Sequence, residues 1–223
     1  MKLRIRTPRN ITPRAAIALQ EKLAPLVKED SELPRSKINS LVGCDAAYSH
    51  GTAIAAATRV DYEKLKVQGR RLVQEPIRFP YIPGLLAFRE APPVLRAIRA
   101  LNVKSYVCLV DAHGLAHPRR FGLACFIGLA LDRPTIGVAK SLLYGTIRGN
   151  QVLDKSDSPI AEVVTLPESG KNIYVSVGHK ITLKDAVEVV KHCSNRTGPI
   201  PINLAHEEVT KRRWLMEKSG QPS

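Results

Sequence analysis

The sequence predicts an α/β fold in which helices flank one mixed β-sheet. Residues 37–48, 52–62 and 64–76 are rich in β-branched and small apolar residues and are separated by short turns, which is typical of three antiparallel strands. After about residue 92, helix-like and strand-like segments alternate, which indicates parallel crossover connections. The 223 residues, 44% of them hydrophobic, suffice for a single domain spanning 1–223.

The first element is expected to be a helix. Apolar residues recur at spacings of three and four over 13–28, with Thr12 placed to act as N-cap and Pro13 as the first helical residue. Pro25 can kink this helix or end it early. A polar loop is expected over 28–36, and the three antiparallel strands follow it.

The second half of the chain is expected to contain the crossovers. Pro92 and Pro93 indicate the start of a helix, and the apolar run 106–110 predicts a central strand covered on both faces. The remaining predicted segments are a helix at 117–131, a strand at 135–138, a polar surface segment at 151–157, a hairpin of 161–166 with 172–178, and helices at 183–193 and about 205–218. This order is the pattern of ribonuclease-H-like folds, although other folds share it. The polar residues after about 218 are expected to be loose.

The charge of the chain favours a polyanionic partner. Lys and Arg number 34 against 20 Asp and Glu, which gives a net charge of +14. Such an excess attracts nucleic acid, while a solvated basic surface, a membrane surface and ribosome contact are the alternatives. Apolar runs such as 121–131 are too short to cross a bilayer, and no secretory apolar core follows the basic N-terminus. We therefore expect a cytoplasmic protein without a membrane partner.

The four cysteines indicate a reducing compartment. Cys44, Cys108, Cys125 and Cys193 form no C-x-x-C pair, and most have apolar neighbours in the sequence. Buried thiols are the expected state of such residues. A zinc site is not expected, because its ligands would have to be clustered.

Three carboxylates stand out because of their positions. Asp45 lies inside an apolar strand, where an unpaired charge is costly. Asp111 ends the apolar run 106–110, at the end of a strand where α/β sheets bind ligands. Glu90, just ahead of Pro92, can approach from the side, although alone it is typical of a surface or capping residue. Carboxylates that converge in this way suit Mg²⁺ or Mn²⁺.

Four ordered motifs resemble the endonuclease V family, and the likeness extends from about residue 13 to residue 215. The motifs are Val42–Asp45, Pro80–Glu90, Val110–Gly122 and Gly137–Ser141. The resemblance implies a ribonuclease-H-like nuclease that nicks DNA at the second phosphodiester bond 3′ to deoxyinosine. The ends would be a 3′-hydroxyl and a 5′-phosphate. Some family members act on inosine in RNA instead.

The resemblance also implies the ligands of the metal ion and its partners. Asp45, Glu90 and Asp111 match the family's metal carboxylates, and His206 resembles a further histidine near the metal. The expected cofactor is Mg²⁺, with Mn²⁺ as a substitute. The expected partner is DNA that contains deoxyinosine, or inosine RNA, and the protein is expected to be a monomer. An inosine-directed ribonuclease, a structure-directed nuclease and a non-catalytic basic binding protein are the alternatives.

The motifs also contain candidate residues for catalysis and substrate binding. Lys140 ends a strand, where a cation can neutralise the scissile phosphate. Tyr81, in a proline-bounded turn, can act as a wedge in the gap left by an extruded base. The other expected substrate-binding residues are Pro83, Gly84 and Leu85 in that turn, Gly114, His117 at a helix start, and Arg119 beside Arg120. Ala112 departs from the glycine common in the family, which puts base discrimination in question.

Overall fold

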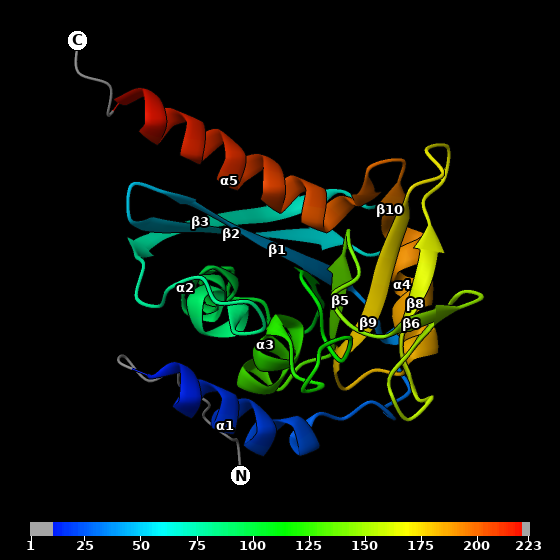
Figure 1. Ribbon diagram of the computed structural model, residues 1–223. Helices are drawn as coiled ribbons and strands as arrows, with labels where there is room; N and C mark the ends of the chain where they lie inside the picture. The colour runs from blue at the N-terminus through cyan, green and yellow to red at the C-terminus, as the bar shows by residue number, and fades with distance from the viewer. Residues whose placement is uncertain (1–10, 220–223) are drawn as a thin grey trace.

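The computed structural model describes residues 11–219 and confirms the mixed sheet with helices on both faces (Figure 1). Within these residues, nine strands form one sheet in the order β3-β2-β1-β4-β5-β9-β8-β7-β6. The strands are β1 (Ser40–Ser49), β2 (Thr52–Asp61), β3 (Val67–Pro76), β4 (Val107–Asp111), β5 (Thr135–Ala139), β6 (Thr146–Arg148), β7 (Gln151–Leu153), β8 (Pro159–Thr165) and β9 (Asn172–His179). A separate two-stranded ladder joins β10 (Ser194–Asn195) and β11 (Gly198–Pro199).

Five α-helices are present in the described part of the chain. They are α1 (Pro13–Leu23), α2 (Leu86–Ala100), α3 (Leu123–Leu131), α4 (Leu183–Cys193) and α5 (Ile200–Ser219), with short 3₁₀ turns at Ala24–Leu26 and Arg35–Lys37. None of the helices in residues 11–219 has both the length and the apolar character needed to cross a bilayer.

The strand pairings confirm the predicted order. β1, β2 and β3 form an antiparallel meander, and β1 then pairs in parallel with β4, which pairs in parallel with β5. The hairpin expected from 161–166 and 172–178 is confirmed as β8 and β9, and β9 closes antiparallel onto β5. The polar surface segment expected at 151–157 is wrong in part, because Gln151–Leu153 pairs with both β6 and β8.

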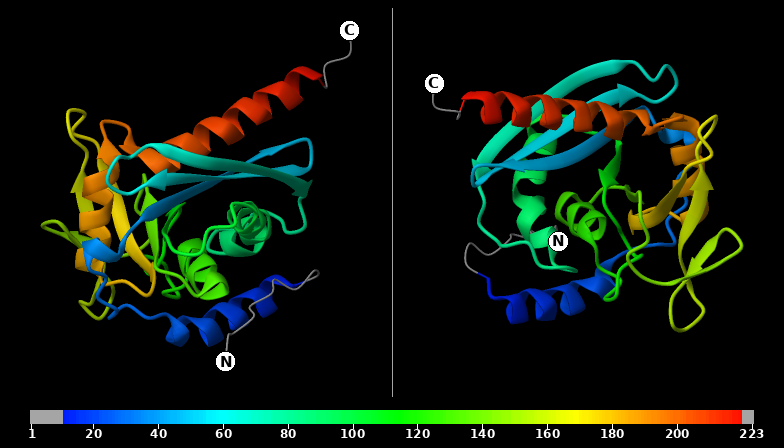
Figure 2. Two further views of the ribbon diagram at one scale, coloured as in Figure 1. Left: turned by 180° about the vertical axis from the view of Figure 1, so that it is seen from behind. Right: turned by 45° about the horizontal axis from the view of Figure 1, so that its top comes forward.

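The helices form layers on the two faces of the sheet. Figures 1 and 2 show α2 and α3 beneath one face with α1 outside them, and α5 crossing the other face over β1–β3. The apolar residues of β1, β4, α2 and α3 share one buried cluster, so the core lies between the sheet and these two helices. A smaller cluster of Ile54, Ala56, Ala205 and Val209 fixes α5 to β2.

Three helix starts were predicted at the wrong place. α2 begins at Leu86 rather than at Pro92, and it contains both prolines. The buried side chains of Ala87, Phe88 and Ala91 stabilise the turns ahead of these prolines. α3 begins at Leu123 rather than at 117, and α5 begins at Ile200 rather than at about 205. α1 ends before Pro25, as expected, with the Thr12 side chain as its cap. The loose tail predicted after about residue 218 lies, from residue 220 on, outside the described residues.

Candidate metal centre and adjoining pocket

Two adjacent strands bring the first two carboxylates together. β1 and β4 run parallel with Cys44 opposite Val110, so the following residues, Asp45 and Asp111, lie side by side where β4 ends. His206, early in α5, places Nδ1 2.7 Å from Asp45 Oδ2. One ligand atom from each of Asp45, Asp111 and His206 lies within 4.8 Å of the others. Chain segments far apart in the sequence thus converge on one point.

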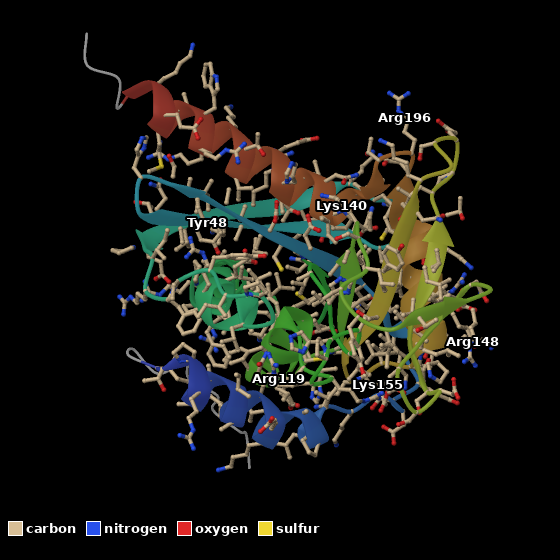
Figure 3. The ribbon with its side chains drawn as sticks, viewed as in Figure 1. Tyr48, Arg119, Lys140, Arg148, Lys155 and Arg196 are labelled. Atoms are coloured by element: carbon tan, nitrogen blue, oxygen red, sulfur yellow. The ribbon has the colours of Figure 1, made fainter. Side chains whose placement is uncertain are left out.

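The electrostatics of this cluster favour a cation. Burial raises the pKa of Asp45, and the neighbouring charge of Asp111 raises it further, while the contact with His206 opposes both effects. Lys140, which Figure 3 labels, follows β5. Its Nζ lies 3.0 Å from Asp111 Oδ2. Two adjoining carboxylates offer the oxygen ligands that suit a divalent cation, and the imidazole adds one nitrogen ligand. The residues present therefore fit a metal centre.

Glu90 approaches the cluster from the opposite face of the sheet. It lies on α2, and its Oε1 accepts a hydrogen bond of 3.0 Å from the hydroxyl of Tyr48 on β1. Burial raises the pKa of Glu90 to about 8, and the charges of Asp45 and Asp111 contribute, against the lowering effect of Tyr48. Glu90 is thus coupled to the metal centre but lies outside the three-residue cluster.

Tyr48 is a site residue that the sequence did not reveal. It lies three residues after Asp45 on the same strand, so its side chain faces α2 while that of Asp45 faces α5. The guanidinium carbon of Arg89 lies 4.1 Å from the centre of its ring. Only the packing of β1 against α2 identifies this contact.

A pocket adjoins the metal centre. Its volume is about 260 Å³, and it includes Ala112 and Ser141, the residues that follow Asp111 and Lys140. The lining is mostly apolar or backbone and consists of Gln20, Tyr81, Ile82, Pro83, Gly84, Leu86, Ala87, Ala112, His113, His117, Gly122, Leu123, Ser141, Leu142 and Leu143. Ala112, which the sequence marked as a departure, therefore contributes to the wall of this pocket.

The turn before α2 forms one wall of the pocket. Tyr81 is 68% exposed, Pro83 is exposed, and both line the pocket. Gly84 has a φ of +78°, which favours glycine, and its carbonyl accepts hydrogen bonds from Gln20 Nε2, His117 Nε2 and Arg119 Nη2 at 2.8 to 3.0 Å. This convergence of three donors holds the turn rigidly beside the pocket.

His117 and Arg119 have different positions from those predicted. His117 is buried in a turn and does not start a helix, so phosphate binding at a helix N-terminus is wrong for it. Its Nε2 donates to Gly84 and its Nδ1 accepts from the Arg119 amide, a pattern that requires a neutral ring, and burial lowers its pKa to about 4. The Arg119 guanidinium binds Gln20 and Gly84. Both residues support the pocket wall.

Gly114 and Leu85 also have other surroundings than expected. A Cβ at Gly114 would lie 2.0 Å from the carbonyl oxygen of Val177, so glycine is needed there for the close approach of β9 rather than of a base. Leu85 is 2% exposed and belongs to the core, so its side chain does not reach a substrate. The next residue, Leu86, lines the pocket in its place.

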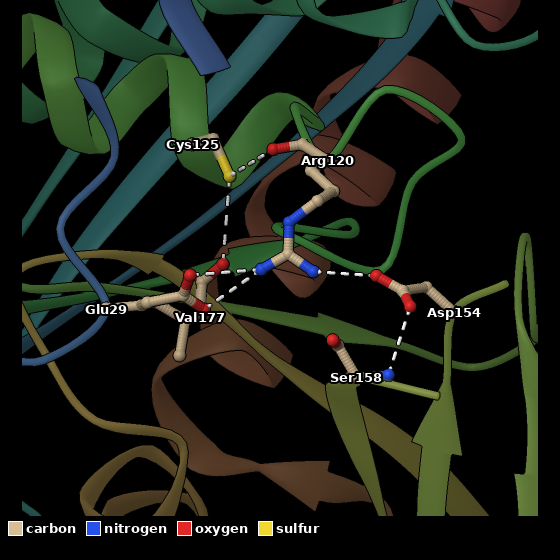
Figure 4. A network of polar contacts seen from close by, with 6 residues as sticks. All are labelled: Glu29, Arg120, Cys125, Asp154, Ser158 and Val177. Carbon is tan, nitrogen blue, oxygen red and sulfur yellow. Dashed lines mark hydrogen bonds and ion pairs between the residues drawn. The ribbon is translucent and has the colours of Figure 1, made fainter. Parts of the chain in front are cut away.

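Arg120 has two carboxylate partners rather than a free guanidinium. Figure 4 shows it between Glu29 and Asp154. Its guanidinium nitrogens lie 3.0 Å from Glu29 Oε1 and 2.9 Å from Asp154 Oδ2. Its φ of +48° bends the chain before α3, and its carbonyl accepts a weak hydrogen bond from the thiol of Cys125. Arg120 thus ties the segment before α3 to two remote loops, and the phosphate contact expected of it is not favoured.

Comparisons with known proteins agree on one family. The profile of the Endonuclease V family matches residues 21–207. Endonuclease V of Desulfurococcus amylolyticus is 43% identical over 200 residues, which cover 85% of this chain and 90% of the relative. The crystal structure of Endonuclease V from Streptomyces avermitilis superposes with a TM-score of 0.86 at 31% identity, covering 99% of this chain and 100% of that one.

A further solved structure contains nucleic acid. It is Endonuclease V of Ciona intestinalis in complex with a 24mer DNA that contains an inosine followed by a ribo-adenosine. It superposes with a TM-score of 0.84 at 27% identity, covering 90% of this chain and 97% of that one. The likeness therefore extends over nearly the whole described fold.

Proposed function

Because this chain belongs to the endonuclease V family and is a nuclease, we propose that it nicks DNA at the second phosphodiester bond 3′ to deoxyinosine. The products would carry 3′-hydroxyl and 5′-phosphate ends. The observation that carries this proposal is the carboxylate cluster of Asp45 and Asp111 beside a pocket bounded by an exposed tyrosine. The alternative of a non-catalytic basic binding protein is excluded, because the chain belongs to a nuclease family.

The proposed cofactor is Mg²⁺, for which Mn²⁺ substitutes, held by Asp45, Asp111 and His206 with Glu90 alongside. A divalent cation held by these residues would polarise the scissile phosphate and neutralise the charge of the leaving oxygen. Lys140, with a side chain that is 61% exposed, can leave Asp111 and donate to the same phosphate. Asp45 and His206 hold each other in place through their hydrogen bond.

The proposed role of the pocket is to hold the extruded hypoxanthine. A flipped base needs a cavity with apolar walls and a few fixed polar groups. The pocket offers aliphatic side chains such as Ile82 and Leu142 and the backbone of the Gly84 turn. Tyr81, exposed at its edge, can occupy the gap left in the stacked duplex.

The test is cleavage of an end-labelled duplex with one deoxyinosine in Mg²⁺, mapped at nucleotide resolution. Asp111→Ala should abolish the nick and leave binding of the duplex largely intact, because it removes a metal ligand. Asp30→Ala, which removes an exposed carboxylate in the loop before β1, is the matched control and should nick normally. EDTA should stop the reaction and added Mg²⁺ restore it. Persistent nicking by Asp111→Ala would overturn the proposed mechanism.

Cleavage next to a ribonucleotide is a second candidate activity. The Ciona intestinalis complex carries a ribo-adenosine directly after the inosine. Matched oligonucleotides with all-DNA, all-RNA and a single ribonucleotide 3′ to inosine should therefore be compared. A faster nick in the two ribonucleotide substrates would assign inosine-containing RNA to this chain, whereas equal rates would favour DNA repair. Cleavage of branched DNA lacking inosine would favour structure recognition instead.

A further inference from the structure

Helix α5 leads from the metal centre to the outside of the molecule. His206 binds Asp45 near the start of this helix, which then crosses β1–β3 and ends at Ser219. Figure 1 and the right view of Figure 2 show its second half extending to the edge of the sheet and beyond. Whatever binds at the metal centre therefore has this half-helix as a neighbour.

The two sides of α5 differ. Ala205 and Val209 are buried against β2, and Met216 packs at the end of the same row. Residues three, four or seven apart lie on one side of a helix, so the side of His206 continues through Arg213, while Lys211, Trp214 and Lys218 share the adjoining side, which faces away from β2. These residues are exposed, and Trp214 is 51% exposed.

The exposed part of the second half is basic and aromatic. From Lys211 to Lys218 there are four cations and one anion. Lys218 places Nζ 4.1 Å from the centre of the Trp214 ring, and Arg213 forms an exposed pair of 3.8 Å with Glu217, which stabilises little. Lys211 forms no ion pair within residues 11–219. The cations are thus available for an anionic partner.

We propose that Lys211, Arg213, Trp214 and Lys218, the α5 arm, bind the backbone of the DNA duplex on one side of the nick. This inference rests on the proposed function and names a surface for its substrate. At 1.5 Å per residue, Trp214 and Lys218 lie roughly 12 and 18 Å beyond His206 along the helix. At 3.4 Å per base pair, that reach corresponds to about four or five base pairs from the scissile phosphate.

Charge selects DNA over the other occupant of such a surface, a second copy of this chain. An exposed tryptophan and leucine are typical of protein contacts, but here cations surround the tryptophan. Two copies would bring equal basic arms together, each from a chain of net charge +14. A phosphate backbone neutralises the same cations, and its sugars can contact the indole.

The first experiment measures binding of an undamaged duplex without metal as salt is raised. Lys211→Gln, Arg213→Gln and Lys218→Gln together should make the plot of log K against log salt shallower by up to about three units, about 0.9 for each phosphate that the protein no longer neutralises. Lys155→Gln, Lys171→Gln and Lys184→Gln remove the same charge from exposed positions in the β7–β8 turn, in the β8–β9 turn and on α4, and should leave the slope unchanged. Equal slopes for both triple variants would overturn the proposal.

Trp214 supplies an independent readout, because it is the single tryptophan of the chain. Its fluorescence should change on addition of duplex. The change should saturate with the Kd that the binding measurement gives at the same salt concentration. On a duplex that contains one deoxyinosine, shortening the flank on one side of the lesion from about ten to about three base pairs should remove this change. A change that depends on protein concentration alone would assign the arm to a second copy and overturn the proposal. Since neither readout requires cleavage, failure here is distinct from failure to nick inosine.

Discussion

At the scale of single residues, Tyr48 and Glu90 form a pair that can set the geometry of the metal centre. The Tyr48 hydroxyl donates to a carboxylate that is buried and lies close enough to Asp45 and Asp111 to feel their charges. A hydrogen bond to an ionised group contributes about 1.5–3 kcal/mol, more than a neutral one. Tyr48 therefore favours the charged form of Glu90, which is the form that binds a cation.

Tyr48→Phe tests this role. Without the hydroxyl, the pKa of Glu90, already about 8, should rise, and the metal concentration that gives half-maximal nicking should rise roughly tenfold or more. Metal titrations at two pH values check this, because higher pH should partly restore the variant. Tyr106→Phe, at the other end of β4 from Asp111, is the control and should behave as the unchanged protein. An unaltered metal requirement in Tyr48→Phe would remove Tyr48 from the site.

The sequence could predict some of these residues and not others, for a physical reason. Asp45 and Asp111 carry a local signal, since each interrupts or ends an apolar run. Glu90 carries a weak signal, since alone it is typical of a surface or capping residue, and His206 was identified through the family resemblance alone. Tyr48 and Gln20 matter through contacts with residues 42 and 64 positions away, which composition and spacing do not encode.

At the scale of elements, the turn before α2 is the segment that most clearly shapes the pocket. Its glycine adopts a φ of +78°, and its carbonyl joins side chains from α1 and from the segment before α3. Loss of this arrangement would change the pocket without touching the metal ligands. The turn should therefore control recognition of the base separately from metal binding.

A pair of glycine variants separates backbone strain from loss of the pocket. Gly84→Ala and Gly51→Ala impose alanine at φ values of +78° and +74°, so each should lose about 1 kcal/mol of unfolding free energy. A new Cβ at Gly84 would lie 2.9 Å from Arg119 Nη2, whereas nothing lies within 4 Å at Gly51. Gly84→Ala alone should weaken discrimination between inosine and adenine duplexes. Similar discrimination in both variants would contradict this role of the turn.

The same elements explain where helix prediction failed. Pro92 and Pro93 are typical of a helix start, but the residues before them are buried in the core and extend the helix toward the pocket. A helix was likewise predicted from residue 117, yet Arg120 has a positive φ and its guanidinium pairs with two remote carboxylates. In both cases tertiary contacts decide against a valid local signal.

At the scale of the whole molecule, His179 joins distant parts of the chain through a neutral ring. Its Nδ1 accepts a hydrogen bond of 3.2 Å from the amide of Lys28, in the segment after α1, and the carbonyl of Lys28 accepts one from Lys180. Burial, followed by the charge of Lys180, lowers the pKa of His179 to about 4, against the opposing effect of Asp132. The connection of α1 to the end of β9 therefore depends on an unprotonated histidine.

This dependence makes stability fall in acid. Since the folded pKa lies below the value of 6.5 in the unfolded chain, the contribution of His179 is complete above pH 6.5 and is lost as pH falls toward 4, a loss of about 3 kcal/mol. His179→Asn keeps an oxygen near the position of Nδ1 to accept from Lys28 but takes up no proton. Urea unfolding at pH 7 and 4.5 should therefore show a difference between the two pH values that is about 2 kcal/mol smaller in the variant. Equal differences in both proteins would mean that acid unfolding starts elsewhere, for instance at His117, whose pKa is lowered in the same way.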